Sequence, residues 1–291
     1  MFTGSLVALV TPFKDGKLDE EGLRANIDFQ IKNGTDGLVV CATTGESPTL
    51  TEEEKEIIIK ISVEICDGRI PVIASTGTNS TVKTLKATER AKELNASGVL
   101  VITPYYNKPT QEGLYQHFKA VTDEVDIPVI VYNVPGRTCV NILPSTVKRI
   151  AEFKNIVGIK EASGDLNQVS EIIQLCNDSI TVLSGDDSLT LPMLAVGAKG
   201  VVSVIANIVP GDLKSMIEAF NRGDFQKARE LHNKLFPLTK AMFYETNPIP
   251  AKAAMELLGM AAGEPRLPLI KISKANEEKL KKSLTEYGIL N

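Results

Sequence analysis

The sequence predicts an α/β protein, a closed (β/α)8 (TIM) barrel with a C-terminal helical extension. Eight short runs rich in Val and Ile start at residues 6, 37, 71, 98, 128, 156, 180 and 200. These runs are continuously apolar, as expected for parallel strands that are covered on both faces. Helix-length segments separate them, and eight such strand-and-helix units are typical of a barrel. An open doubly wound sheet is the alternative, because periodicity does not show closure.

The segments between the strands have apolar residues at helical spacings of three and four. One of them, TEEEKEIIIKISVEIC, begins at Thr51, and Thr51 and Glu54 have the spacing of a capping box. Two more helices are predicted from Asn79 and from Thr110, where a cap candidate precedes each apolar pattern.

After the eighth unit the chain shows helical patterns at about 224–245, 249–260 and 274–287, with no strand pattern between them. Barrels of this kind typically have about 250 residues, which is fewer than this chain has. We therefore predict a catalytic barrel over residues 1–223 and a three-helix extension over residues 224–291.

Composition excludes several classes of function. The formal charge of -4 and the pI near 5.5 give no basic footprint for nucleic acid. No apolar stretch approaches the roughly 20 residues of a membrane span, and the N-terminus lacks a signal-peptide pattern, so we expect a cytoplasmic protein. Four scattered cysteines without a CxxC pair indicate reduced thiols.

The chain has two histidines, His117 and His232, which lie far apart in helix-like stretches. A histidine-rich metal site cannot be built from them, so we expect no metal and no cofactor. Lysine, tyrosine, hydroxyl and carboxylate groups remain for the chemistry.

If the barrel closes, polar groups at the carboxyl ends of its strands meet at one mouth. Lys160 ends the sixth strand in IVGIKEASGD, where burial would favour a neutral, nucleophilic amine that can form a Schiff base with a ketone. The alternative is a strand-end lysine that extends to solvent. Strand alternation predicts that Ile156 and Gly158 share the face of Lys160, while Val157 and Ile159 face the helices.

Three neighbouring strand ends offer partners for such a lysine. Tyr132 can shuttle protons, although a packed core tyrosine is the alternative. Thr43 and Thr44 precede a turn that can hold a carboxylate, and Arg137 can bind a second carboxylate or remain a solvated charge.

Long strings of the sequence resemble a known family. They are GTDGLVVCATTGESPTLTEEE, GVLVITPYYNKPTQEGLYQHF, IPVIVYNVPGRT, VGIKEASGD, LSGDD, GVVSVIAN and ETNPIPAK, in this order. Together they resemble the 4-hydroxy-tetrahydrodipicolinate (dihydrodipicolinate) synthase family, one of the pyruvate-dependent class I aldolases related to N-acetylneuraminate lyase. The resemblance runs from about residue 4 to beyond residue 268.

The resemblance implies a lyase that condenses pyruvate with L-aspartate 4-semialdehyde, the first committed step of diaminopimelate and lysine biosynthesis. It implies that Lys160 forms the Schiff base and that Tyr132, Thr43 and Tyr106 relay protons. The tyrosine at the position of Tyr106 comes from a neighbouring subunit in this family, which implies a homotetramer built as a dimer of dimers.

The remaining roles implied by the resemblance concern binding. Thr44, Gly185 and the main chain at Val202 would contact pyruvate, and Arg137 would hold the carboxylate of the semialdehyde. Positions of a lysine-effector pocket correspond to Ser47, Pro48, Asn79, Lys83 and Tyr105.

One of these positions departs from the lysine-inhibited members. Lys83 replaces a glutamate that contacts the effector's amino group, and Glu52 and Lys55 stand where histidines are frequent. Like charges repel, so the sequence predicts weak or absent inhibition by lysine.

Two other functions remain open from the residues. A sister aldolase for a sugar-derived 2-oxo acid would share Lys160, Tyr132 and the TTGE string, whereas Arg137 and the YYNKP string favour the synthase. A barrel that binds a carboxylate without converting it is the alternative of another class.

Overall fold

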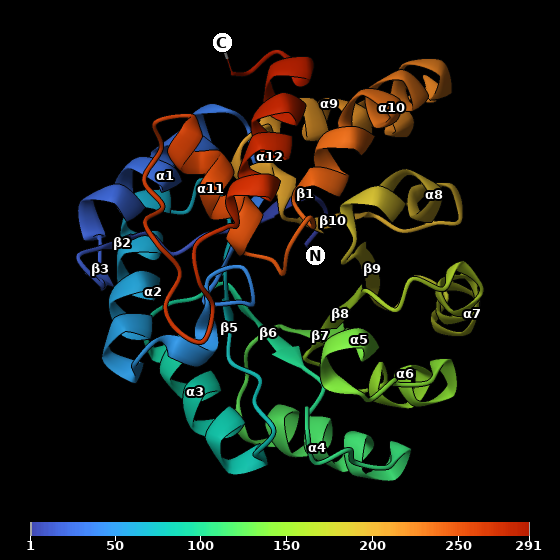
Figure 1. The fold of residues 1–291 in the computed structure, drawn as a ribbon. Coiled ribbons are helices and arrows are strands. Elements are labelled where there is room, and N and C mark those ends of the chain that lie inside the picture. Colours follow the sequence, from blue (N-terminus) through green and yellow to red (C-terminus); the bar gives the residue numbers. More distant parts are fainter. Residues whose placement is uncertain (1, 291) are drawn as a thin grey trace.

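A computed structural model describes residues 2–290 and confirms the predicted barrel. Eight parallel strands close in the order β1-β10-β9-β8-β7-β6-β5-β4, and helices surround them (Figure 1). The strands are β1 (Gly4–Ala8), β4 (Gly37–Val40), β5 (Val72–Ser75), β6 (Gly98–Ile102), β7 (Val129–Asn133), β8 (Ile156–Glu161), β9 (Thr181–Ser184) and β10 (Gly200–Ser203).

The helices that follow the strands lie where the apolar spacing predicts them. Thr51 caps α2 and Glu54 returns the hydrogen bond, so the capping box is confirmed. The helices before the extension are α1 (Glu20–Lys32), α2 (Glu52–Cys66), α3 (Thr81–Glu93), α4 (Gln111–Glu124), α5 (Pro135–Thr138), α6 (Pro144–Ile150), α7 (Leu166–Cys176), α8 (Thr190–Ala195) and α9 (Pro210–Asn221).

Several short elements have no counterpart in the sequence pattern. A hairpin of two-residue strands, β2 (Phe13–Lys14) and β3 (Lys17–Leu18), precedes α1. Three 3-10 turns, η1 (Ser47–Thr49), η2 (Asp187–Leu189) and η3 (Ile205–Asn207), follow β4, β9 and β10. Elements this short are too brief to produce a periodicity.

Three helices follow the barrel, namely α10 (Phe225–Ala241), α11 (Ile249–Leu257) and α12 (Lys274–Tyr287). Buried side chains of α10 and α12, such as Leu238 and Leu284, belong to the same hydrophobic cluster as those of the barrel helices. The extension therefore has no separate core, and the boundary at residue 223 stays a prediction.

The sixth barrel strand, β8, carries a bulge that corrects one prediction. Val129 of β7 pairs with Ile156, but the next residue, Ile130, pairs with Gly158, which leaves Val157 unmatched. Ile156 consequently packs among the outer helices, and Val157 packs against the cluster inside the barrel. Simple alternation assigned these two residues to the wrong faces, because a bulge places two consecutive residues on one side.

A buried ion pair joins the extension to the barrel mouth. Lys252 of α11 lies 2.7 Å from Glu46, and both side chains are 1% exposed. The Lys252 ammonium also donates to the Thr11 carbonyl and lies 4.2 Å from the centre of the Phe13 ring. The backbone N–H of Arg266 donates to the second oxygen of Glu46, so the carboxylate is held on both sides.

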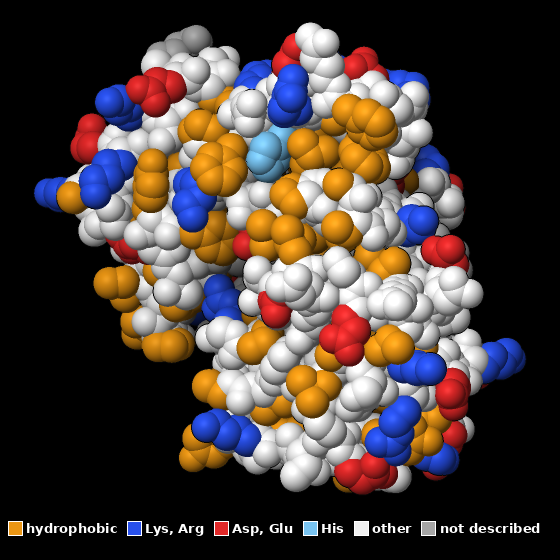
Figure 2. All heavy atoms as spheres, turned by 90° about the vertical axis from the view of Figure 1, so that its right-hand side faces the viewer, with side chains coloured by type: hydrophobic (Ala, Val, Ile, Leu, Met, Phe, Trp, Pro, Cys, Tyr) orange, Lys and Arg blue, Asp and Glu red, His pale blue; other side chains and the backbone are white. Residues whose placement is uncertain are grey.

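The surface carries apolar side chains on the side of the molecule where α8 and α10 lie (Figure 2). Val196, Phe225 and Phe236 are the large exposed hydrophobic residues of this region. Among the described residues, no helix has both the length and the apolar character that crossing a membrane requires.

The buried ion pair gives a stability prediction. Lys252→Met leaves the Glu46 carboxylate buried without its cation, so we expect the free energy of unfolding to fall by about 3–5 kcal/mol. Lys227→Met removes an exposed pair with Glu230 and should cost less than about 1 kcal/mol. Urea denaturation measures both, and equal losses in the two variants would contradict the prediction.

Candidate active site

A cavity of about 160 Å³ opens at the carboxyl ends of the barrel strands. It brings together six residues that the sequence selected, from four different strand ends or the segments after them. They are Thr43, Thr44, Tyr132, Arg137, Lys160 and Gly185. Also lining the cavity are Ala8, Ala42, Val134, Ala162, Asp186, Val204, Phe243 and Asn247.

Lys160 points into the barrel and is 5% exposed. It lies in register with Tyr132 of β7 on one side and with Leu183 of β9 on the other. Its ammonium lies 4.2 Å from the centre of the Tyr132 ring, within the range of a cation–π contact. No carboxylate oxygen among residues 2–290 lies within 4.0 Å of this ammonium. A lysine held in this way is dry and is not committed to an ion pair.

Gly185 has no side chain, and the stem of Lys160 lies in the space that a side chain there would fill. A Cβ atom at Gly185 would lie 3.1 Å from Cε of Lys160 and 2.6 Å from Cβ of Ala162. Any larger residue would therefore push against the lysine stem or the neighbouring backbone. The position of the Lys160 stem therefore depends on the absence of a side chain at residue 185.

The loop that carries Thr43 and Thr44 has a constrained backbone. Cys41 and Glu46 both have φ of 55°, so left-handed residues bracket the two threonines. Thr44 is buried, and its hydroxyl accepts a hydrogen bond of 3.0 Å from the side-chain amide of Asn247. The ion pair of Glu46 with Lys252 fixes the end of the loop, so the hydroxyls are preorganised.

Asn247 is a site residue that sequence reasoning missed. It lines the cavity, and its backbone carbonyl accepts a hydrogen bond of 3.4 Å from the Arg137 guanidinium. Its side-chain Oδ1 is buried and has no partner among the described residues. Asn247 lies in the string ETNPIPAK. The sequence analysis interpreted the prolines of this string as residues that end a helix, and so it assigned Asn247 no role.

Arg137 lies on the short helix α5, and its side chain is exposed at the rim of the cavity. Val202 lies deeper, because its side chain packs inside the barrel and does not line the cavity. Val202 is therefore not among the residues that line this cavity.

Tyr106 is not brought into this cavity. Its side chain is 88% exposed, and its φ of 75° is unusual for a non-glycine residue. The tyrosine stands out from the loop after β6, on the outside of its own chain. Its neighbour Tyr105 is 38% exposed.

The predicted effector positions are only partly gathered. Ser47 and Lys83 line a second cavity together with Glu52 and Lys55. Asn79 accepts a hydrogen bond through its carbonyl from Asn107, and Pro48 is exposed.

Neither histidine lines the cavity at the barrel mouth. His117 bonds Thr81 through Nδ1, and burial lowers the pKa of His117 to about 4. Within residues 2–290, no group of three or more His, Cys, Asp or Glu side chains is arranged to hold a metal ion.

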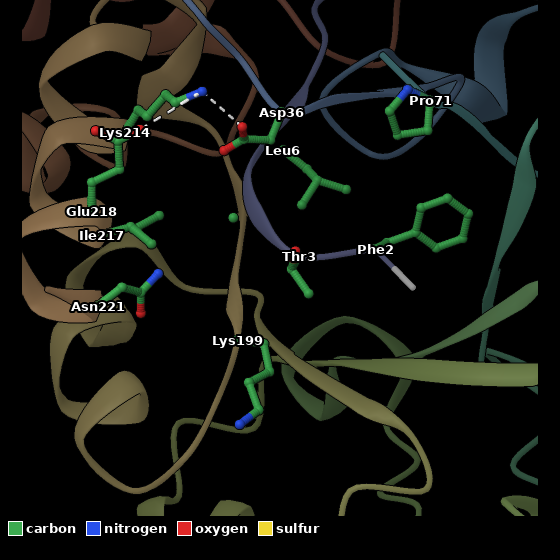
Figure 3. Close-up of a pocket in the computed structure, with 11 residues that line it drawn as sticks. Phe2, Thr3, Leu6, Asp36, Pro71, Lys199, Lys214, Ile217, Glu218 and Asn221 are labelled. Atoms are coloured by element: carbon green, nitrogen blue, oxygen red, sulfur yellow. Dashed lines mark hydrogen bonds and ion pairs between the residues drawn. The ribbon is translucent and has the colours of Figure 1, made fainter. Parts of the chain in front are cut away.

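A third cavity of about 420 Å³ lies at the opposite end of the barrel, where the strands begin (Figure 3). Lys214 there forms an ion pair of 2.8 Å with Asp36 and also donates to the Gly34 carbonyl. Asp36 accepts from the backbone of Ser5, so these charges brace the start of β1. The amino-terminal end of such barrels typically serves stability, whereas the carboxyl end carries chemistry.

The fold and the mouth cavity, with its buried lysine, are typical of barrel enzymes that act through a Schiff base. Residues 1–287 of the 291 match the model of the dihydrodipicolinate synthetase family. The chain belongs to this family, which confirms the resemblance seen in the sequence.

Known proteins similar to this chain carry related names. A 4-hydroxy-tetrahydrodipicolinate synthase of Geotalea uraniireducens is 56% identical over 290 residues, and the match covers 100% of both chains. The crystal structure of dihydrodipicolinate synthase from Aquifex aeolicus has a TM-score of 0.97 and 53% identity, covering 99% of each chain. A variant described as the first monomeric dihydrodipicolinate synthase has a TM-score of 0.98 and 48% identity, covering 99% of this chain and 98% of its own.

Proposed function

We propose that this enzyme condenses pyruvate with L-aspartate 4-semialdehyde to form 4-hydroxy-tetrahydrodipicolinate, in the diaminopimelate and lysine pathway. The observation that carries the proposal is the dry Lys160 amine beside Tyr132, in a cavity that also holds the Thr44 hydroxyl. Family membership and the names of full-length relatives support the synthase over the sister aldolase.

The chemistry begins with attack of the Lys160 amine on C2 of pyruvate, and water leaves as the imine forms. Loss of a methyl proton gives the enamine, whose carbon attacks the aldehyde of the second substrate. The amino group of that substrate then attacks the imine carbon, closes the ring and releases the lysine. No oxidant, metal or cofactor is needed to balance these steps.

Protons must move at each of these steps, and two side chains near the amine can move them. The Tyr132 hydroxyl both donates and accepts, and Thr43 lies at the cavity wall, so together they can form a relay. Thr44, Gly185 and the main chain at Val202 would hold pyruvate, and Arg137 at the rim would hold the semialdehyde carboxylate.

Reduction with borohydride tests the covalent step. With pyruvate present we expect one reduced adduct on Lys160, found by peptide mass mapping, and none in Lys160→Ala. Lys154→Ala is the matched control, because Lys154 is exposed and precedes the same strand. An adduct that persists in Lys160→Ala would refute the role of this lysine.

Two further variants separate the roles in a coupled assay. Tyr132→Phe should lower kcat by about 10² or more while pyruvate still binds. Arg137→Ala should raise KM for the semialdehyde about tenfold or more, with a smaller effect on the pyruvate step. The assignment of Arg137 fails if both substrates are affected equally.

We propose in addition that the chain works as a homotetramer, a dimer of dimers, in which Tyr106 completes the neighbour's relay. Tyr106 is exposed and turned away from its own Lys160, so it can act in another chain. The exposed apolar residues beside α8 and α10 offer a second contact surface (Figure 2). The cytoplasmic location expected from the sequence also stays a prediction.

Complementation tests whether Tyr106 acts across subunits. Tyr106→Phe and Lys160→Ala should each be nearly inactive, yet equal co-expression should restore about a quarter of wild-type activity, because half the dimers are mixed and each has one intact site. Sedimentation of the mixture measures the assembly. No recovery in proven mixed dimers would place Tyr106 in its own chain's site, or outside the mechanism.

Lysine should inhibit this enzyme weakly or not at all. Lys83 and Lys55 line the cavity at the effector positions, and they repel the effector's ammonium groups. Initial rates over a lysine titration measure the effect, with Lys83→Glu as the variant expected to gain sensitivity. Strong inhibition of the wild type at micromolar lysine would contradict this expectation.

A further inference from the structure

A network of four polar side chains lies behind the barrel mouth, on the helix side of β7 and β8. Its centre is Glu161, the last residue of β8, which is 1% exposed and directly follows Lys160. Successive side chains of a strand point to opposite faces, so Glu161 points towards the helices while Lys160 points into the barrel. The other three members are Asn133, Asn141 and Gln168.

The recorded partners of the Glu161 carboxylate are all N–H donors. The side-chain amide of Asn133 donates to Oε2 at 2.9 Å, and that of Gln168 donates to the same oxygen at 3.2 Å. The backbone N–H of Ser163 donates to Oε1 at 2.6 Å. Among residues 2–290, no Lys, Arg or His nitrogen lies within 4.0 Å of this carboxylate. These surroundings suit an ionised carboxylate, which accepts hydrogen bonds and donates none.

The donors that face Glu161 are fixed in their orientation. The Asn133 oxygen accepts from the backbone N–H of Ile142 at 3.2 Å, so turning this amide over would set one N–H against another. The Gln168 oxygen accepts from the Asn141 amide at 2.7 Å, and the oxygen of that amide accepts from Asn133 at 2.8 Å. Both oxygens of residue 161 must therefore be acceptors for the network to close.

This network joins the two strand ends that carry the proposed chemistry. Tyr132 of β7 pairs in register with Lys160 of β8, and the next pair along the same two strands is Asn133 with Glu161. The first pair points into the barrel, and the second pair is bonded on the outer side. The outer hydrogen bonds therefore hold the backbone from which the inner pair projects.

We propose that Glu161 is a positioning residue, whose ionised carboxylate keeps Lys160 level with Tyr132 from the opposite face of the sheet. The inference rests on the proposed function, because it requires that Lys160 attacks pyruvate. Glu161 does not touch the substrate and acts through the backbone of β8. A small misplacement of an attacking atom slows the chemical step, even where the binding contacts of the substrate are kept.

The rate of adduct formation with pyruvate, measured by borohydride trapping at increasing times, tests this role. Glu161→Gln keeps the shape of the side chain, but in either orientation its new N–H group faces another N–H. We expect the rate at saturating pyruvate to fall about tenfold or more, while the pyruvate concentration for half-maximal rate changes less than about twofold. A role in stability alone would leave the rate of the folded variant unchanged.

Two further variants calibrate this measurement. Gln168→Met removes one donor to the carboxylate and keeps the charge, so it should lower the same rate by a smaller factor, and it carries the test if Glu161→Gln does not fold. Asp36→Asn weakens the ion pair with Lys214 at the opposite end of the barrel, so it should lower stability and leave the rate unchanged. Circular dichroism and thermal melting show that each variant is folded.

The outcomes distinguish this inference from the proposed function. If the wild type forms no adduct, both are refuted. If the wild type forms the adduct and both Glu161→Gln and Gln168→Met form it equally fast, only the positioning role is refuted. A loss of rate in Asp36→Asn as large as that in Glu161→Gln also overturns the positioning role, because stability alone would then explain the effect.

Discussion

Closure of the barrel through β1 is the constraint on which every other feature depends. Leu6 pairs with Val202 of β10 on one side and with Gly37 of β4 on the other. This double pairing leaves no open edge, so all eight carboxyl ends face the same mouth. Thr44 after β4 and Lys160 on β8 come from nearly opposite parts of the strand order, and closure makes them line one cavity.

Register then decides which side chains enter that cavity. Tyr132, Lys160 and Leu183 lie level on three adjacent strands, and all three face inward. The bulge at Val157 shifts the register of β8 by one residue near the start of the strand. From Gly158 onward the pairing is regular, and Lys160 pairs with Tyr132. The lysine and its phenol neighbour are therefore aligned by backbone hydrogen bonding, which is stiffer than any loop contact.

The sequence predicted what local chemistry determines and missed what depends on the register and on long-range contacts. Apolar runs and caps identified the strands and helices, and strand ends identified Lys160, because these signals lie within a few residues. The inward side of Ile156 was wrong, since a bulge has no signature in an apolar run. Asn247 was missed as a site residue because its bond to Thr44 spans 203 residues. Tyr106 is exposed in the single chain, and such a position does not by itself indicate a role.

The two buried lysines, Lys252 and Lys160, differ in the groups that contact their ammonium. Lys252 has a carboxylate at 2.7 Å and a carbonyl as partners, so although burial lowers its pKa, Glu46 opposes that shift and stabilises the charged form. Its amine is occupied and braces the threonine loop. Lys160 is nearly as buried, yet its recorded partner is the face of the Tyr132 ring. A ring holds an ammonium group less firmly than a carboxylate does, so the Lys160 side chain is not tied to an ion-pair partner. Within residues 2–290, an acidic oxygen lies within 4.0 Å of the Lys252 ammonium but not of the Lys160 ammonium, and this difference leaves Lys160 available for the proposed attack on pyruvate.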